Sequence, residues 1–381
     1  TYFDTFQRYM YAGAVGITVD EARRAVSENA ALQKQLATET LANDRLRRTV
    51  STLQQRIRTA KLNSAKSTVN TFTVDAVNGS RIKNLFIYYT GFSFATFLLL
   101  FSVLIPANSE FPFSHLKNSR CFAHLSLQDQ LFFVLCKLRN GLHFKDLAFR
   151  FNISPQNASI LFRTWINYIY FTFASVSLWP PREIIQQHMP DKFKRDFPNT
   201  IALIDSTEIR IQRPSALKSQ SQCWSEYKSS PTLKGLVAID PRGSILFVSA
   251  LFTGSISDNQ LVVDSGFLHT LSLLLDAGRL DIGDEIMSDK GFTCSKEFEN
   301  LGLHLIVPPF AVGGDQQMPA PDVTLTKNIA AHRVHVERAI GRIKNFKILS
   351  QRIDISFLTC INQIWSVCAF LTNFMPALVK K

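Results

Sequence analysis

The stretch Ile-Ala-Leu-Ile-Asp-Ser-Thr (Ile201–Thr207) places an aspartate, Asp205, at the end of an apolar run. β-Branched and apolar residues dominate this run, as in a strand that crosses the core of a sheet. Three further β-rich runs follow, separated by turn residues: EIRIQRP (Glu208–Pro214), LKGLVAID (Leu233–Asp240) and SILFVSALF (Ser244–Phe252). These runs predict strands of one sheet, with Asp205 at the end of the first strand.

Helices and strands alternate in the chain that follows. The pattern predicts a helix from Asp258 to about Leu275, a strand in DEIMSD (Asp284–Asp289), a helix in SKEFENLG (Ser295–Gly302), a strand in LHLIVPP (Leu303–Pro309), a polar loop at about 311–326 and a last long helix from near Lys327 to about Leu349. In a ribonuclease-H-like domain, several strands come first, helices and strands then alternate, and a helix comes last. The order predicted here is the same. The predicted fold class is therefore α/β, a mixed sheet flanked by helices.

Three acids lie on elements of this domain where their carboxylates could bind metal ions. Asp205 and Asp289 end two strands that would be neighbours in the sheet, and Glu337 lies in the last helix. Two divalent cations can activate a nucleophile and neutralise a scissile phosphodiester, and Mg²⁺ requires oxygen ligands that converge. Each acid alone has a plainer interpretation, because aspartates form turns and helical glutamates are usually solvated. The three together favour a metal site.

Basic residues surround Glu337 on the last helix. The set consists of Arg333, Arg338, Arg342 and Lys344, and such a helix could follow a phosphate backbone. The alternative is an ordinary salt bridge between Arg333 and Glu337, which are four residues apart. In the strand region, Lys228 and Lys234 are further candidates for DNA contacts, close in sequence to Trp224 and Tyr227.

Four segments resemble the DDE superfamily endonuclease domain of PIF/Harbinger-like transposases, and most nearly the ISL2EU type. They are CWSEYKSSPTLKGLVAI (Cys223–Ile239), GSISDNQ (Gly254–Gln260), SDKGF (Ser288–Phe292) and IAAHRVHVERAIGRIKNFKIL (Ile329–Leu349). The resemblance extends over about 200–375, within a domain expected at 196–381. It implies a catalytic and metal-binding triad of Asp205, Asp289 and Glu337, with two Mg²⁺ ions (Mn²⁺ as a substitute) as cofactors.

The resemblance also covers acids and bases near the triad. Asp258 in GSISD is either an auxiliary acid near the metals or a helix N-cap, and the N-cap interpretation is favoured. Glu208 is a less suitable ligand, because it points to the opposite face from Asp205 on an extended strand. Lys290 stands where relatives often have arginine, and this change leaves the neighbouring acid intact.

Residues 121–185 are predicted to form a helix-turn-helix that binds DNA. SLQDQLFFVLCKLRNG (Ser126–Gly141) ends at a glycine suited to a helix C-terminus, and HFKDLAFRF (His143–Phe151) is a short second helix. Ser154 can cap a third, longer helix that has Pro155 at its first position. This order of helices is that of a helix-turn-helix, although a three-helix packing unit without DNA contacts has the same spacing.

The N-terminal part is expected to contain an oligomerisation segment at 1–70 and a linker with an apolar helix at 71–120. Within the first, residues 20–62 have a heptad pattern that predicts a dimeric coiled coil, or alternatively a solvated helix. The uncharged stretch Leu85–Pro106 has the length of a membrane span, but a buried core helix is the favoured interpretation. No leader sequence is expected, and the zinc-binding module that precedes some relatives is absent or lies outside this sequence.

Charge and cysteine content agree with an intracellular, nuclear protein. The formal net charge of +12 favours an anionic partner such as nucleic acid. The 6 cysteines are scattered without a CxxC pair, so a zinc finger or a disulfide scaffold is not expected.

The resulting hypothesis is a nuclear DDE transposase that cuts and joins DNA by two-metal-ion catalysis. Its partners would be transposon-end and target DNA, a second copy bound through the coiled coil, and a separate DNA-binding protein, with no small-molecule cofactor. The alternatives are a domesticated transposase-derived nuclease or DNA-binding protein, and a membrane-attached coiled-coil protein.

Overall fold

The computed structural model describes residues 54, 72–106, 122, 125–309 and 319–379. The predicted coiled coil at 20–62 lies outside these residues apart from Gln54. One compact unit contains residues 71–272 and 279–381, and all the predicted helix-turn-helix and site residues belong to it.

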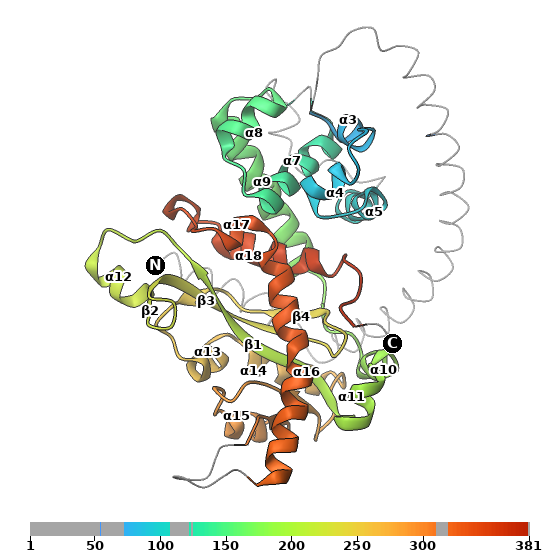
Figure 1. The fold of residues 1–381 in the computed structure, drawn as a ribbon, viewed down its shortest axis with the longest axis vertical. Helices are drawn as coiled ribbons and strands as arrows, with labels where there is room; N and C mark the ends of the chain where they lie inside the picture. Colours follow the sequence, from blue (N-terminus) through green and yellow to red (C-terminus); the bar gives the residue numbers. More distant parts are fainter. Residues whose placement is uncertain (1–53, 55–71, 107–121, 123–124, 310–318, 380–381) are drawn as a thin grey trace. The chain divides into compact units, whose positions relative to one another are not determined.

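A helical region precedes the sheet (Figure 1). Its helices are α3 (Val74–Asn78), α4 (Leu85–Thr90), α5 (Phe94–Leu104), α7 (Leu127–Asn140), α8 (Phe144–Phe151), α9 (Pro155–Ala174), α10 (Arg182–His188) and α11 (Asp191–Asp196).

The described residues of the α/β region form seven strands: β1 (Thr200–Arg210), β2 (Trp224–Ser225), β3 (Ser230–Ile239), β4 (Ile245–Val248), β5 (Phe252–Thr253), β6 (Glu285–Met287) and β7 (His304–Ile306). Its helices are α12 (Leu217–Cys223), α13 (Asp258–Asp264), α14 (Phe267–Asp276), α15 (Ser295–Glu299), α16 (Ala320–Lys344), α17 (Lys347–Ser350) and α18 (Ile361–Thr372), with a 3₁₀ turn at Ile355–Phe357.

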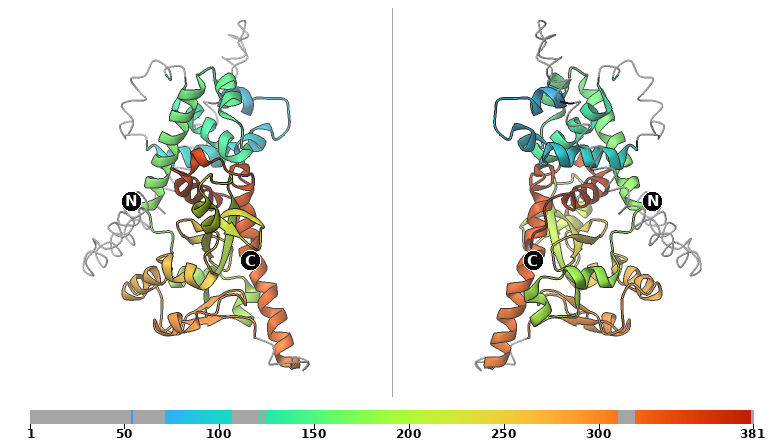
Figure 2. Two further views of the ribbon diagram at one scale, coloured as in Figure 1. Left: turned by 90° about the vertical axis from the view of Figure 1, so that its left-hand side faces the viewer. Right: turned by 90° about the vertical axis from the view of Figure 1, so that its right-hand side faces the viewer.

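The sheet is mixed, as predicted for a ribonuclease-H-like core. Its main path is β2-β3-β1-β6-β7, and β4 and β5 also pair with β3. β1 is antiparallel to β3 and parallel to β6, and β6 is parallel to β7. The side views show the sheet between α16 and α13 (Figure 2). The central position of β1 explains its apolar first half, because Ile201, Leu203 and Ile204 are fully buried.

The first two predicted strands are one strand. β1 continues without interruption from Thr200 to Arg210, so Asp205 lies inside it rather than at its end. Its pairing with β6 stops at Leu203, whereas its pairing with β3 continues as far as Arg210. The prediction that Asp205 ends the strand was therefore wrong, although Asp205 does lie just beyond the end of the parallel pairing.

Three predicted helices have different bounds. The stretch Leu85–Pro106 forms two helices, because Gly91 has φ of 81° and Ser93 caps α5. In the part of the chain that the structure describes, none of the helices has the length and apolar character needed to cross a bilayer. The helix expected after Asp258 is divided into α13 and α14 at Gly266, where φ is 78°. The last helix begins at Ala320, seven residues before the predicted Lys327.

The three helices of the predicted helix-turn-helix are confirmed. The Ser154 hydroxyl accepts the Asn157 amide at the start of α9, and Pro155 is its first residue. Gly141 ends α7 in the left-handed region, with φ of 66°. α9 also packs against α18, which fixes this helical region to the sheet domain.

Candidate active site

Asp205 is placed by β1 in a half-buried position two residues past the last β1–β6 pair. Opposite it on β3 is Val237, and its carboxylate accepts the Ser206 amide at 2.8 Å. Partial burial removes much of the water around this carboxylate, and one backbone N–H, that of Ser206, donates to it. Burial raises the pKa of Asp205 to about 6.

Asp289 follows β6 by two residues. β1 and β6 are parallel neighbours, and their last pair is Leu203 with Met287. Asp205 and Asp289 each lie two residues past this pair, which brings Asp289 to the region of Asp205. The Asp289 carboxylate accepts the Lys290 amide at 2.6 Å and an Arg333 Nη1–H at 3.0 Å. Among the described residues, Arg333 therefore forms its ion pair with Asp289, and not the helical pair with Glu337 that the spacing allows.

Glu337 lies on the exposed face of α16, one turn after Arg333. α16 packs against β1, which carries Asp205, and against β3. The negative charges of Asp289 and Glu337 add to burial in raising the pKa of Asp205, while Arg333 acts in the opposite direction. Asp289 and Glu337 are therefore both within electrostatic range of Asp205.

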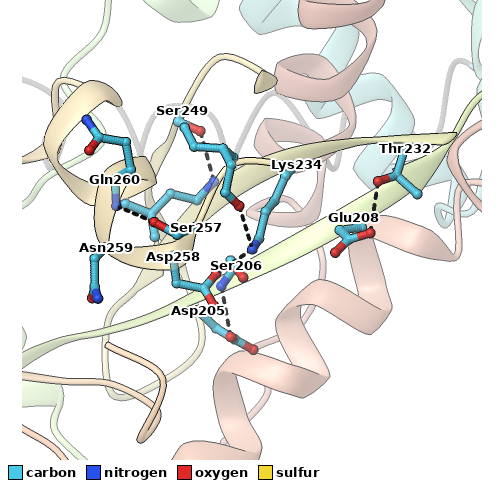
Figure 3. Close-up of polar contacts among 12 residues, drawn as sticks. Asp205, Ser206, Glu208, Thr232, Lys234, Ser249, Ser257, Asp258, Asn259 and Gln260 are labelled. Atoms are coloured by element: carbon cyan, nitrogen blue, oxygen red, sulfur yellow. Dashed lines mark hydrogen bonds and ion pairs between the residues drawn. The ribbon is translucent and has the colours of Figure 1, made fainter. Parts of the chain in front are cut away.

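Asp258 does not cap α13, so the favoured interpretation of this residue was wrong. The Ser257 hydroxyl accepts the Gln260 amide as the N-cap, and Asp258 is the first helical residue. Its carboxylate pairs with the Lys234 ammonium at 2.9 Å (Figure 3). Lys234 also donates to the Ile256 carbonyl at 3.2 Å. Since Lys234 is only 9% exposed, it is unsuited to contact DNA.

Glu208 is engaged away from the triad. Its carboxylate accepts the Thr232 hydroxyl at 2.9 Å, as Figure 3 shows. Burial, followed by the charge of Lys228, lowers the pKa of Lys344 on α16. The negative charges of Glu208 and Asp205 act in the opposite direction. Lys344 is therefore within electrostatic range of both acids and of Lys228.

Exposed basic and aromatic side chains continue from Lys344. The Lys228 ammonium lies 4.0 Å from the centre of the Tyr227 ring, and Tyr227 is 82% exposed. On α16, Arg338 is exposed, whereas an Arg342 Nη1–H donates to the Pro376 carbonyl. Of the six predicted DNA-contacting residues, Arg338 is exposed and Lys228, Arg342 and Lys344 are half-buried, whereas Arg333 and Lys234 pair with acids. Their contact with DNA stays a prediction.

His332 and His335 have structural surroundings. His332 is fully buried, with Nδ1 2.7 Å from the Asn328 carbonyl and its ring packed against Phe193 and Phe197. Burial, followed by the charge of Arg338, lowers the pKa of His335 to about 4. At neutral pH the His335 ring is therefore uncharged.

Comparison with protein families gives the assignment. The model described as DDE superfamily endonuclease matches residues 204–373, which include all three acids. A second model, helix-turn-helix of DDE superfamily endonuclease, matches residues 123–175. The chain contains a DDE superfamily endonuclease domain, preceded by the helix-turn-helix of that superfamily. None of the functionally curated proteins matches it.

The endonuclease domain therefore starts within β1 and ends after α18, and the helix-turn-helix that accompanies it covers α7 to α9. Membership of this superfamily implies a nuclease, and the superfamily generally uses divalent metal ions. The PIF/Harbinger subtype rests on the sequence resemblance alone.

The chemistry of the acids suits such ions. Three carboxylates supply the hard oxygen ligands that Mg²⁺ prefers, and a cationic side chain already lies among them. Within the described residues, however, no three His, Cys, Asp or Glu side chains are grouped closely enough to hold a metal ion. Sequence reasoning found the acids but missed the Arg333–Asp289 and Lys234–Asp258 pairs, because neither pair follows from a helical or strand spacing.

Proposed function

We propose that this endonuclease is a transposase of the PIF/Harbinger-like type that cuts and rejoins DNA with two divalent ions held by Asp205, Asp289 and Glu337. The observation that carries the proposal is the electrostatic coupling of Asp205 to both other acids and to Arg333. Coupled acids around one cation, on the elements that the family motif requires, are better explained by a metal site than by surface charge.

Each acid has a role that follows from its position. Asp205 and Asp289, at the adjacent ends of the β1–β6 pairing, would bridge the ions, and Glu337 would complete one of the two sites from α16. When bound, two such ions activate the attacking hydroxyl and stabilise the leaving oxygen. The half-buried position of Asp205 excludes water from one side of its carboxylate, which strengthens its attraction for a cation.

The basic residues are proposed to hold the DNA backbone. Lys344, Arg338 and Arg342 lie along α16 beside the acids, and Lys228 extends this region toward the loop after β2. Guanidinium and ammonium groups neutralise phosphates without reading sequence. These contacts would orient a phosphodiester over the carboxylates.

The helix-turn-helix is proposed to position the enzyme on its DNA. At the start of α9, Gln156 and Arg163 are exposed, and Ile160 between them is 49% exposed. A recognition helix places such N-terminal residues in the major groove. Transposition would further involve a second copy bound through residues 1–70, a separate DNA-binding protein and a nuclear location, all of which remain proposals.

Cleavage of DNA by the full chain tests the proposed function. Supercoiled plasmid and duplexes taken from the DNA on either side of the coding sequence are incubated with Mg²⁺, with Mn²⁺ or with a chelator. We expect nicking or cutting with either ion and none with the chelator. Glu337→Gln should reduce the rate by about 100-fold, because it weakens one of two ion sites.

The matched control is Asp264→Asn, which removes an exposed acid from α13 outside the site. Its rate should equal that of the wild type. Joining of the cut 3′ ends to a target plasmid would support a transposase, and cutting without joining a domesticated nuclease. A Glu337→Gln variant that cuts as fast as the wild type would exclude Glu337 from the site.

A further inference from the structure

Arg333 occupies a central position among the acids. Its Nη1 lies 3.0 Å from Asp289 Oδ1, and its side chain is 11% exposed while that of Asp289 is 51% exposed. Arg333 also lies on α16 four residues before Glu337. One guanidinium on this helix therefore pairs with an acid that follows β6.

The contact that Arg333 makes is incomplete. A guanidinium can give a carboxylate two parallel hydrogen bonds, but here Nη1 alone reaches Asp289. The Nε–H is buried and has no hydrogen-bond partner among the described residues. A buried charged donor without a partner is costly, so this guanidinium would gain from a better acceptor.

The position of Arg333 also bears on metal binding. Like charges in a partly dehydrated site repel, and a cation among them lowers that repulsion. Arg333 supplies this positive charge in the metal-free protein, and Asp289 is oriented toward it. The Asp289 carboxylate cannot face the guanidinium and a metal ion equally well. In agreement with this, no three His, Cys, Asp or Glu side chains in the described part of the chain are grouped closely enough to hold a metal ion.

We propose that Arg333 is a displaceable counter-ion, which pairs with Asp289 in the metal-free enzyme, is released when divalent ions bind, and then binds a phosphate of the DNA. This inference rests on the proposed function. Phosphate oxygens can accept the two parallel donors that Asp289 leaves unused, so release supplies the acceptor that the buried Nε–H lacks. Arg333 is a positioning residue in this scheme, and it couples metal loading to substrate binding.

Metal affinity measures the competition between the Arg333 charge and a divalent ion, and chemical modification of Arg333 separates its release from a permanent ion pair. Mn²⁺ is titrated into the full chain without DNA, and binding is followed by calorimetry and by loss of the free-ion paramagnetic resonance signal. Removing the competing charge in Arg333→Gln should tighten Mn²⁺ binding by about 10-fold or more. Arg333→Lys keeps the charge and should bind Mn²⁺ close to the wild-type affinity.

The control is Lys327→Gln, which removes one positive charge from an exposed position six residues earlier on α16. Its Mn²⁺ affinity should be unchanged. Equal or weaker binding by Arg333→Gln, or equal tightening by Lys327→Gln, would overturn the proposal. Arg333→Met, which preserves the packing of the aliphatic stem, serves if the glutamine variant does not fold.

A second measurement uses the wild-type protein. Phenylglyoxal modifies accessible guanidinium groups, and mass spectrometry gives the rate at each arginine. We expect the rate at Arg333 to rise several-fold when Mg²⁺ is added and to fall again when DNA is added, while the rate at Arg195 stays constant. An unchanged rate at Arg333 in a protein that binds Mg²⁺ would refute the release of Arg333 but leave the proposed function standing. Absence of Mg²⁺ and Mn²⁺ binding would refute both.

Discussion

Asp205→Asn is expected to abolish DNA cleavage while it stabilises the metal-free protein. Loss of a bridging carboxylate removes several kcal/mol of charge stabilisation, which corresponds to a rate reduction of about 1,000-fold or more. Stability should change in the opposite direction, because burial raises the pKa of Asp205 to about 6. An ionised Asp205 therefore costs the metal-free fold free energy at neutral pH, and asparagine does not carry this cost.

The pH dependence of this gain follows from the direction of the shift. A carboxyl group whose pKa is higher in the folded protein favours folding fully at pH below about 4, and that contribution is lost as the pH rises through about 6. The gain from Asp205→Asn should thus be roughly 2–3 kcal/mol at pH 7.5 and close to zero at pH 4. Urea unfolding with a chelator present, at both pH values, measures it.

The wild-type enzyme provides the comparison for this prediction. Metal ions require the ionised carboxylate, so Mg²⁺ should restore stability to the wild type at pH 7.5 and not to Asp205→Asn. If Asp205→Asn is less stable than the wild type without metal, or still cuts DNA at the wild-type rate, Asp205 is not a buried acid whose function is to bind cations.

Gly254→Ala is expected to destabilise the domain by about 2–4 kcal/mol, because the added methyl group has no space. A Cβ at this position would lie 2.1 Å from Thr232 Oγ1, 2.8 Å from the Cys223 carbonyl oxygen and 2.9 Å from the Thr232 carbonyl oxygen. Two of these three atoms are backbone, so a side-chain rotation cannot relieve the clash. Moving Thr232 would also disturb its hydrogen bond to Glu208.

Gly341→Ala is the matched control for this substitution. Gly341 lies in α16, and a Cβ there meets nothing within 4 Å. Alanine should therefore stabilise the protein by up to about 1 kcal/mol through helix propensity. Thermal and urea unfolding of the two variants should show opposite shifts. A Gly254→Ala protein as stable as the wild type would mean that the turn before α13 is packed less tightly than the structure describes.

The sequence predicted the order of elements in the sheet domain because its strands are short, apolar and separated by strong turn residues. It could not predict that β1 is one strand from Thr200 to Arg210. Ser206 and Thr207 interrupt the apolar run, yet the backbone continues because β3 pairs with it along its whole second half. The early start of α16 at Ala320 was missed for a similar reason, since Pro321 is tolerated in a first helical turn.

For the candidate site, the sequence indicated which acids to consider but not what they contact. Asp205, Asp289 and Glu337 were chosen by motif, and the parallel β1–β6 pairing then explains why two of them are neighbours. The spacing of α16 favours an Arg333–Glu337 pair, and tertiary packing directs Arg333 to Asp289 instead. Long-range ion pairs of this kind depend on the positions of whole elements, which local patterns do not specify.

Counting bound Mn²⁺ ions tests the central claim most directly. Paramagnetic resonance titration of the full chain in the presence of DNA should give two bound Mn²⁺ per chain for the wild type. The triple variant Asp205→Asn, Asp289→Asn, Glu337→Gln, checked for folding by circular dichroism, should bind none at these positions. If the folded triple variant binds Mn²⁺ with the wild-type number and affinity, the three acids do not form the metal site.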